Sequence, residues 1–295
     1  MTATAAPSAG GAGHRFHPTV LREYDIRGIV GETLFAADAR ALGQAYATMI
    51  RQGGGRRVCA GMDGRLSSPE LAEALIGGLC AAGIDVQWIG RGPTPMLYFA
   101  VHHLGADGGV QVTGSHNPPA HNGFKMMLGT KSFFGARIQE LGRIAAQAAY
   151  AQGRGQRTDA PVFDAYVERL ARDFPSPRAA LGLRQTAELA SRPLSVVWDA
   201  GNGAAGEALR ALTARLPGRH RLLYADIDGR FPNHHPDPTV DANLEDLRTA
   251  LETEGAEIGI AFDGDGDRIG VIDGQGRIVR GDQLMQILAA EVLPR

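Results

Sequence analysis

The sequence predicts an α/β protein made of two successive domains, each with a mixed, mainly parallel sheet that carries helices on both faces. Short apolar runs of strand length alternate with longer runs of helical periodicity, which is the pattern of a sheet covered on both sides. The alternation stops in a polar, glycine-rich stretch at residues 151–160 and then starts again. With 295 residues, 44% of them apolar, the chain is long enough for two ordinary domains.

The first predicted domain covers residues 16–155. We expect strands over residues 56–63, 84–90, 106–114 and 122–128, and helices over residues 38–50, 67–83, 94–105 and 135–153. In the second of these helices Ser67 or Ser68 is the predicted N-cap, Pro69 lies in the first turn, and Gly83 ends the helix.

The second predicted domain covers residues 160–278. We expect strands over residues 193–200, 220–227, 256–263 and 268–279, and helices over residues 161–174, 203–216 and 243–255. Residues 281–295 are predicted to form a further helix, because four side chains share one apolar face: Leu284, Ile287, Leu288 and Val292. The sequence shows nothing that could cover this face, so we expect an orphan helix that begins a truncated third domain.

Composition and charge argue against several classes of protein. A formal net charge of −2 is not typical of a general nucleic-acid or membrane-surface binder. The two cysteines, Cys59 and Cys80, form no disulfide framework and fit a cytoplasmic location. No apolar run approaches the roughly 18 residues of a membrane span. Residues 1–15 lack the apolar core of a signal peptide and are predicted to be a disordered tail.

The stretch "FDGDGDR" at residues 262–268 is the strongest chemical signal. It alternates glycines with three carboxylates: Asp263, Asp265 and Asp267. Carboxylates this close repel one another unless a cation neutralises them, and hard oxygen ligands suit Mg²⁺. An EF-hand would need Gly and Glu where Arg268 and Gly274 stand. The competing interpretation is a solvated acidic turn, and in either case we expect the loop to be exposed at a strand end.

The stretch "TGSHNPPAHNGFK" at residues 113–125 places Ser115 on a loop that two prolines stiffen. A nucleophile elbow would need glycine where Thr113 and Asn117 stand. No catalytic triad is expected, because adjacent side chains such as those of Ser115 and His116 generally diverge. The loop gathers hydrogen-bond donors and one cation, which suits a serine that carries a phosphoryl group: His116, Asn117, Asn122 and Lys125. A polar loop without chemistry remains the alternative.

Three further patterns are open to more than one interpretation. Gly201, Gly203 and Gly206 have the spacing of a dinucleotide-binding turn, and Asp226 follows at the required distance, yet the same glycines also suit a tight structural turn. Arg65 stands at the end of a predicted strand, where ligand sites of α/β proteins lie. A zinc site is not favoured by the spacing of two neighbouring histidines near Asp237: His234 and His235.

Three motifs together identify a family. "EYDIRG" at residues 23–28, the serine loop and the acidic loop occur in this order and at domain-scale spacing. The chain thereby resembles the α-D-phosphohexomutases over about residues 16–295, most closely the phosphomannomutase/phosphoglucomutase type. "EYDIRG" and "GSHNP" favour this mannose or glucose type, and the phosphoglucosamine type is the alternative.

The resemblance implies a role for individual residues. Ser115 would carry the phosphoryl group and bind Mg²⁺ together with the three aspartates. Arg27, His116 and Lys125 would surround the transferring phosphate, with Arg27 and Lys125 as candidates for proton transfer. Contacts to substrate or phosphate would come from four more residues: Tyr24, Asn117, Asn122 and Arg268. The turn at residues 201–206 would then be structural and bind no nucleotide.

The resemblance also implies an activity. The enzyme would interconvert hexose 1-phosphate and hexose 6-phosphate through a hexose 1,6-bisphosphate, with glucose 1,6-bisphosphate as the activator that phosphorylates the serine. Its partners would be sugar phosphates, with no nucleic acid or membrane, and the oligomeric state is not indicated. The family has four domains, and the third and fourth hold the sugar and its distal phosphate. We therefore expect turnover by these residues alone to be at least about a thousandfold below that of a four-domain relative.

Overall fold

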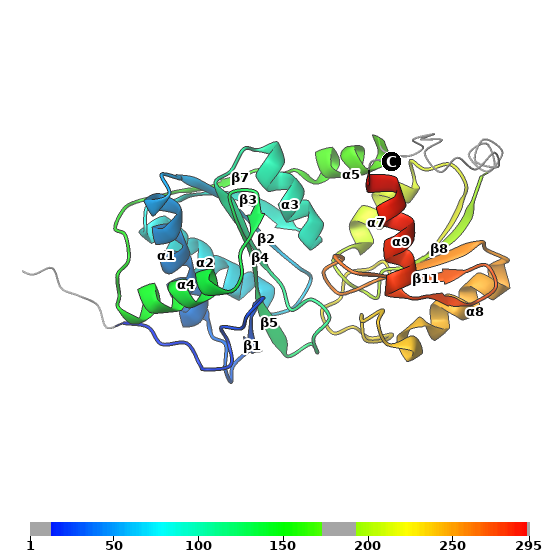
Figure 1. Ribbon diagram of the computed structural model, residues 1–295, viewed down its shortest axis with the longest axis horizontal. Helices are drawn as coiled ribbons and strands as arrows, with labels where there is room; N and C mark the ends of the chain where they lie inside the picture. Colours follow the sequence, from blue (N-terminus) through cyan, green and yellow to red (C-terminus); the bar gives the residue numbers. More distant parts are fainter. Residues whose placement is uncertain (1–12, 173–192, 294–295) are drawn as a thin grey trace, which may run out of the picture.

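The computed structural model describes residues 13–172 and 193–293. The chain forms two lobes, each built on its own sheet (Figure 1). Most of residues 1–15, the predicted tail, lie outside the described residues. His14 belongs to that predicted tail, but it contacts the first lobe: its backbone amide donates to the Ala145 carbonyl and its ring lies 2.7 Å from the Asp38 carboxylate.

The first sheet has seven strands in the order β1-β5-β4-β2-β3-β7, with β6 paired to β5. Strands β2, β3, β4 and β7 are mutually parallel, whereas β1, β5 and β6 are antiparallel to their neighbours. The strands are β1 (Ile26–Ile29), β2 (Arg57–Met62), β3 (Asp85–Arg91), β4 (Gly108–Val112), β5 (His121–Leu128), β6 (Lys131–Ser132) and β7 (Arg157–Asp159). The mixed, mainly parallel sheet is the one that the sequence predicts.

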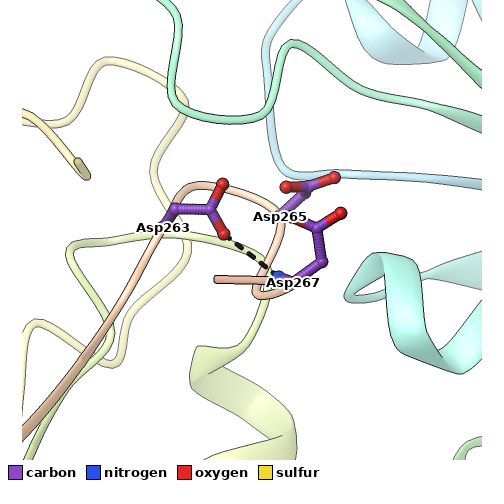
Figure 2. Close-up of side chains that lie close together, drawn as sticks. All are labelled: Asp263, Asp265 and Asp267. Carbon is purple, nitrogen blue, oxygen red and sulfur yellow. Dashed lines mark hydrogen bonds between the residues drawn. The ribbon is translucent and has the colours of Figure 1, made fainter. Parts of the chain in front are cut away.

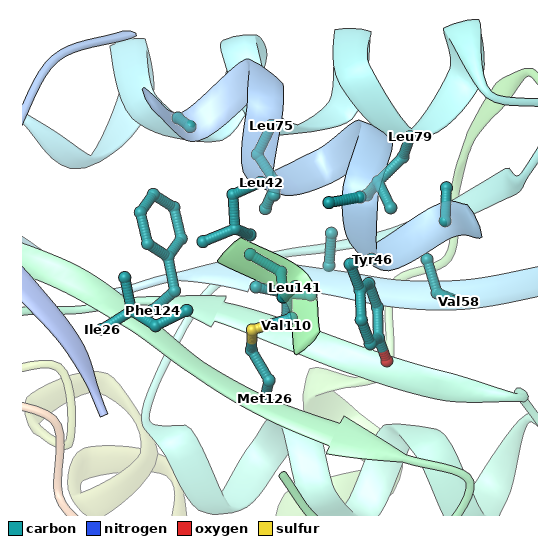
Figure 3. Close-up of a cluster of buried hydrophobic side chains, with 14 of the residues drawn as sticks. Ile26, Leu42, Tyr46, Val58, Leu75, Leu79, Val110, Phe124, Met126 and Leu141 are labelled. Carbon is teal, nitrogen blue, oxygen red and sulfur yellow. The ribbon is translucent and has the colours of Figure 1, made fainter. Parts of the chain in front are cut away.

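Helices cover both faces of this sheet because its strands point alternate side chains to opposite sides. On β2, Val58 and Ala60 join a core with α1, α2 and α4, whereas Cys59 joins a second core with α3. Figure 3 shows the first core, with Leu42 and Leu75 of α1 and α2 packed toward the strands. The helices are α1 (Ala36–Gln52), α2 (Ser68–Ala81), α3 (Thr94–His103) and α4 (Ala136–Ala146).

The second sheet has five strands in the order β12-β11-β10-β8-β9. Strands β9 and β10 run parallel to β8, and β11 runs antiparallel to both of its neighbours, β10 and β12. The strands are β8 (Ser195–Asp199), β9 (Arg219–Leu223), β10 (Ile258–Phe262), β11 (Ile269–Asp273) and β12 (Ile278–Val279). The helices are α5 (Phe163–Arg172), α7 (Gly206–Thr213), α8 (Glu245–Glu254) and α9 (Gly281–Val292), and a 3-10 turn (Asp241–Leu244) precedes α8. One face packs on α8 through Leu247, the other on α7 through Leu209.

The predicted boundary at residues 151–160 is not simply a linker. It contains β7, which pairs with β3 and extends the first sheet. The prediction missed β7 because all three of its side chains are exposed, so that its composition is that of a loop. Helix α5, predicted in the second domain, packs its buried Tyr166 and Val167 into the core formed by α3 of the first sheet.

The side chains of the two serines predicted to cap α2 bind another residue, Asn122. Ser67 occupies the N-cap position, but neither hydroxyl caps the helix. Both hydroxyls instead accept hydrogen bonds of 2.9 Å from the side-chain amide of Asn122. The stop signal is confirmed: the helix ends at Ala81, and Gly83 then takes a φ of +83° that a residue with a side chain rarely adopts.

Helix α9 is the predicted final helix. Arg280, at its N-cap, pairs with Asp241 at 2.8 Å, and Met285, Ile287 and Leu288 are exposed. No helix in the described ranges combines the length and apolar character that crossing a bilayer requires.

Candidate active site

The serine loop and the acidic loop meet between the two sheets. The first follows β4, and the second joins β10 to β11. The Ser115 hydroxyl donates a 2.8 Å hydrogen bond to the Asp263 carboxylate, 148 residues away in the chain. The expectation of an exposed acidic loop holds only in part: Asp267 and Arg268 are exposed, but Asp263 and Asp265 are fully buried, because the serine loop and the start of α3 cover them.

The three aspartates converge on one turn of the acidic loop (Figure 2). One oxygen from each lies within 4.8 Å of the others. The backbone amides of Asp267 and Arg268 donate to the Asp263 carboxylate at 3.0 and 3.1 Å, which holds the turn closed. Gly266 has a φ of +70°, so that the alternating glycines provide the backbone freedom that the turn needs.

Lys125, on β5, is the cation that reaches this cluster. Its ammonium group lies 2.8 Å from Asp265, also contacts Asp267, and lies 3.5 Å from the Ser115 hydroxyl. Burial alone would lower the pKa of Lys125, but the charges of the two aspartates outweigh it and raise that pKa. Lys125 therefore carries its proton at neutral pH.

The cluster still holds more negative charge than the protein neutralises. Burial and the neighbouring carboxylates of Asp265 and Asp267 raise the pKa of Asp263 to about 7. One oxygen of Asp265, Oδ1, is buried without a hydrogen-bond partner among the described residues. A buried carboxylate oxygen left unpaired is costly, and a divalent cation would satisfy it. The oxygen-only donor set fits Mg²⁺.

Thr94 is a contact of this cluster that the sequence analysis missed. It begins α3, and its hydroxyl and backbone amide both donate to Asp265, the amide at 2.8 Å. Its position immediately after β3 was the available signal, since polar residues at the ends of parallel strands line α/β sites. Thr94 therefore orients Asp265 from the first lobe.

The side chain of His116 approaches the serine rather than diverging from it as expected. Its Nδ1 lies 3.3 Å from the Ser115 hydroxyl. Burial, reinforced by the positive charge of Arg268, lowers the pKa of His116, so the ring is neutral near pH 7. The shorter hydrogen bond of Ser115 goes to Asp263, at 2.8 Å.

Arg27 of β1 is buried beside the cluster. It pairs with Asp25 at 2.9 Å, and its Nε has no hydrogen-bond partner in the described ranges. Burial lowers the pKa of its guanidinium, opposed by the charges of Asp25 and Asp265. An unpaired buried N–H is a suitable donor for an anionic oxygen.

Four predicted contact residues are placed differently from one another. Arg268 is exposed at the end of the acidic loop, and its positive charge helps to lower the pKa of His116. The backbone carbonyl of Asn117 accepts a hydrogen bond from the side chain of Arg65. Asn122 is fully buried and bonded to Ser67 and Ser68, so its side chain holds the loop. Tyr24 is 79% exposed, and its ring lies 6.5 Å from that of Phe134, which is not a residue of the cluster.

The dinucleotide-like turn supports the acidic loop. A side chain at Gly203 would come within 2.9 Å of the Gly264 carbonyl, and one at Gly206 would collide with the Ala225 carbonyl. The Gly264 carbonyl also accepts a 2.9 Å hydrogen bond from the Ala204 amide, at the start of α7. The glycines of this turn therefore allow its backbone to pack closely against the acidic loop and against Ala225.

Of the two neighbouring histidines, His234 bonds to the buried Asp199 at 2.8 Å. In the described parts of the chain, the three aspartates are the one group of three or more potential metal ligands close enough to share an ion.

Models of the phosphoglucomutase/phosphomannomutase α/β/α domains I and II match residues 18–150 and 164–276. The chain belongs to this family of α-D-phosphohexomutases. A family member from Neisseria meningitidis serogroup B, a phosphoglucomutase, is 41% identical over 278 residues, or 94% of this chain and 57% of that protein. A phosphomannomutase/phosphoglucomutase from Pseudomonas aeruginosa is 39% identical over 277 residues, with the same coverage.

The solved structure of a family protein from Burkholderia thailandensis superimposes with a TM-score of 0.86 at 43% identity, covering 94% of this chain and 59% of that one. The chain thus spans a little more than half the length of the relatives it matches. The resemblance inferred from three motifs is confirmed at the level of the phosphohexomutase family.

Proposed function

We propose that this protein transfers a phosphoryl group between Ser115 and a hexose phosphate, and so takes part in interconverting the 1-phosphate and 6-phosphate of mannose or glucose. The observation that supports this most is the position of the Ser115 hydroxyl, 2.8 Å from Asp263 and 3.5 Å from Lys125. The mannose or glucose type is favoured by the names of its relatives, phosphoglucomutase and phosphomannomutase. The phosphoglucosamine type is the alternative.

In the proposed transfer, the bond between Ser115 Oγ and phosphorus forms as the bond between phosphorus and the sugar oxygen breaks. The serine loses its proton, and the sugar oxygen takes one up. Arg27 and Lys125 are the proposed proton-transfer groups; the raised pKa of Lys125 keeps its ammonium group charged at neutral pH, so it can hydrogen-bond the negative charge that develops on the leaving oxygen. The partnerless Nε of Arg27 is the proposed donor to the transferring phosphate, with His116 and Arg268 beside it.

Asp263, Asp265 and Asp267, together with the oxygen of Ser115, are the proposed ligands of Mg²⁺. A bound Mg²⁺ would neutralise charge on the transferring group. The protein's own contribution is to fix the serine, because positioning and charge neutralisation account for most of the catalysis of phosphoryl transfer. The proposed activator is glucose 1,6-bisphosphate, which would phosphorylate Ser115. A cytoplasmic location stays a prediction.

Phosphate uptake tests the proposal directly. The 295-residue chain is incubated with glucose 1,6-bisphosphate and Mg²⁺, and its intact mass should rise by one phosphoryl group that peptide mapping places on Ser115. Ser115→Ala should take up none, and chelation of the metal should slow uptake in the wild-type chain. Phosphate on another residue, or equal uptake by Ser115→Ala, would contradict the assignment. Parallel reactions with mannose and glucosamine 1,6-bisphosphates distinguish the sugar types.

A further inference from the structure

Arg65 is buried beneath the serine loop, and its two terminal nitrogens donate to backbone carbonyls of that loop. Nη1 donates to the carbonyls of Pro118 and His121 at 2.7 and 2.9 Å. Nη2 donates to the carbonyls of Ser115 and Asn117 at 2.7 and 2.6 Å. The four N–H groups at the end of the side chain are therefore used on four backbone oxygens. Arg65 stands where ligand sites of α/β proteins lie, but all four of its terminal N–H groups are bonded to the loop, so none of them is left to donate to a phosphate.

A carboxylate next to Arg65 holds the start of the same loop. One oxygen of Asp63 accepts from the Gly114 amide at 3.1 Å and lies 3.3 Å from Arg65 Nε. Its other oxygen accepts from the Arg65 amide at 3.0 Å. A side chain at Gly114 would overlap the Arg65 guanidinium, so the loop and the arginine fit together only when residue 114 is glycine.

The loop conformation that Arg65 binds is an unfavourable one. Ser115 has a φ of +49°, in the left-handed region that residues with side chains rarely occupy. Such a conformation is unfavourable and persists only where surrounding contacts determine it. Here the contacts are the Arg65 bond to the Ser115 carbonyl and a 2.8 Å bond from the Ser115 amide to the Thr113 hydroxyl. This conformation aims the Ser115 hydroxyl at Asp263.

The second lobe covers Arg65 from the other side. The ring of Phe231 lies 5.1 Å from the guanidinium carbon, within the range of a cation–π contact. A side chain at Gly229 would come within 2.6 Å of the Arg65 backbone, so the segment from Gly229 to Phe231 packs closely on it. The second lobe thereby supplies both the acidic loop and the cover over the residue that shapes the serine loop.

We propose that Arg65 is a positioning residue, which holds Ser115 in the left-handed conformation needed for phosphoryl transfer without itself touching the substrate. This inference rests on the proposed function. Arg65→Lys replaces a planar group with four terminal donors by a single ammonium, which cannot bond four carbonyls in a plane. Gly114→Ala leaves Arg65 in the chain but displaces its guanidinium. Both variants should therefore release the loop.

The test combines single-turnover kinetics with hydrogen exchange. In both variants the rate constant for Ser115 phosphorylation by glucose 1,6-bisphosphate at saturation should fall about a hundredfold, since a displacement of about 1 Å can cost that much. The donor concentration at half-saturation should change less than about threefold, because Arg65 contacts no substrate, whereas loss of a substrate-binding arginine would raise it. Arg91→Lys, an exposed arginine at the end of β3, is the matched control and should leave both values unchanged.

Hydrogen exchange separates this inference from the proposed function. Backbone amides of residues 113–122 should exchange at least about tenfold faster in Arg65→Lys and Gly114→Ala than in the wild type, whether or not Ser115 takes up phosphate. Wild-type protein that takes up no phosphate would contradict the proposed function alone. A folded variant with a wild-type transfer rate and unchanged exchange overturns the role of Arg65. If Arg65→Lys does not fold, the transfer rate and the hydrogen exchange of Gly114→Ala test the role of Arg65.

Discussion

Lys125 shows how a single residue adjusts the charge of the site. Its ammonium group contacts Asp265 and Asp267, two of the three carboxylates proposed to bind Mg²⁺. Lys125 and a bound Mg²⁺ would therefore compete for the same oxygens. The side chain of Lys125 is only 15% exposed and that of Asp265 is fully buried, so neither charge is well solvated when its partner is removed.

Lys125→Met should therefore make the protein depend more strongly on Mg²⁺. Without the metal, the variant should lose about 3 kcal/mol of stability, because the buried carboxylate of Asp265 and the partly exposed carboxylate of Asp267 lose their cation. With Mg²⁺, much of that loss should be recovered, so the rise in melting temperature on adding Mg²⁺ should exceed that of the wild type. Thermal denaturation in chelator and in Mg²⁺ measures both. Lys131→Met, on the exposed strand β6, is the control. Equal metal effects in Lys125→Met and wild type would count against this competition.

His234 provides a pH dependence at the same scale. Burial alone would lower its pKa, but the hydrogen bond to Asp199 and the charge of Asp199 outweigh burial and raise the pKa above its usual value. Between the unfolded pKa, about 6.5, and the higher folded pKa, the folded protein holds a proton that the unfolded chain has lost. The stability from this pair is therefore full below about pH 6.5 and falls as the pH rises through the folded pKa.

His234→Gln should lower the free energy of unfolding more at pH 5.5 than at pH 9. Urea denaturation of wild type and variant across this range measures the difference. Asp199→Asn should remove the same pH dependence, because it removes the charge that raises the pKa. A difference between wild type and His234→Gln that stays constant with pH would show that His234 is not protonated in this pair.

At the scale of elements, two adjacent glycines in α2 show how closely α1 and α2 pack. A side chain at Gly78 would collide with the Arg40 carbonyl of α1 and lie 3.1 Å from the Gln44 amide. A side chain at Gly77 would meet only the end of the flexible Arg40 side chain, at 3.0 Å. Residue 77 therefore has room for a side chain, whereas the packing of α1 against α2 requires glycine at residue 78.

Gly78→Ala should lower the free energy of unfolding by about 1–3 kcal/mol, because the backbones of α1 and α2 must separate. Gly77→Ala should raise it by about 0.5–1 kcal/mol, because alanine loses less conformational entropy than glycine in a helix. Urea denaturation of the two variants gives the comparison. Effects of the same sign and size would show that the close approach of the helices is not what selects glycine at residue 78.

At the scale of the whole molecule, α5 joins the two lobes. Its Val167 is fully buried in a core with Leu97 and Val101 of α3 and Ala208 of α7. Together with the hydrogen bonds from Thr94 to Asp265, this core fixes the first lobe against the second. We therefore expect the two lobes to unfold in one cooperative transition.

Val167→Ala should weaken this joint. Two buried methyl groups are lost, which should lower the free energy of unfolding by about 2 kcal/mol. Leu170→Ala, on the same helix but 37% exposed at residue 170, should cost much less. Denaturation followed by two probes, one in each lobe, measures the loss and shows whether the transitions still coincide. Equal losses in the two variants would contradict the placement of α5 between the lobes.

The long elements could be predicted because their signals are local. The helix expected over residues 38–50 is α1, Ala36–Gln52, and the strand expected over residues 84–90 is β3, Asp85–Arg91. Strands β1, β6 and β7 were missed, since two to four residues are too few to show a periodicity and their pairing partners lie elsewhere in the chain.

By itself, the sequence determined the two α/β units, the three motifs and the family to which they belong. The spacing of three aspartates on one loop needs no partner to be recognised, because its electrostatic repulsion is local. Only the tertiary structure decided that this loop is buried against Ser115, that Lys125 and Thr94 hold Asp265, and that Arg65 binds the backbone of the serine loop. Those contacts join segments more than 30 residues apart, and backbone carbonyls, which every residue carries, leave no mark in a sequence.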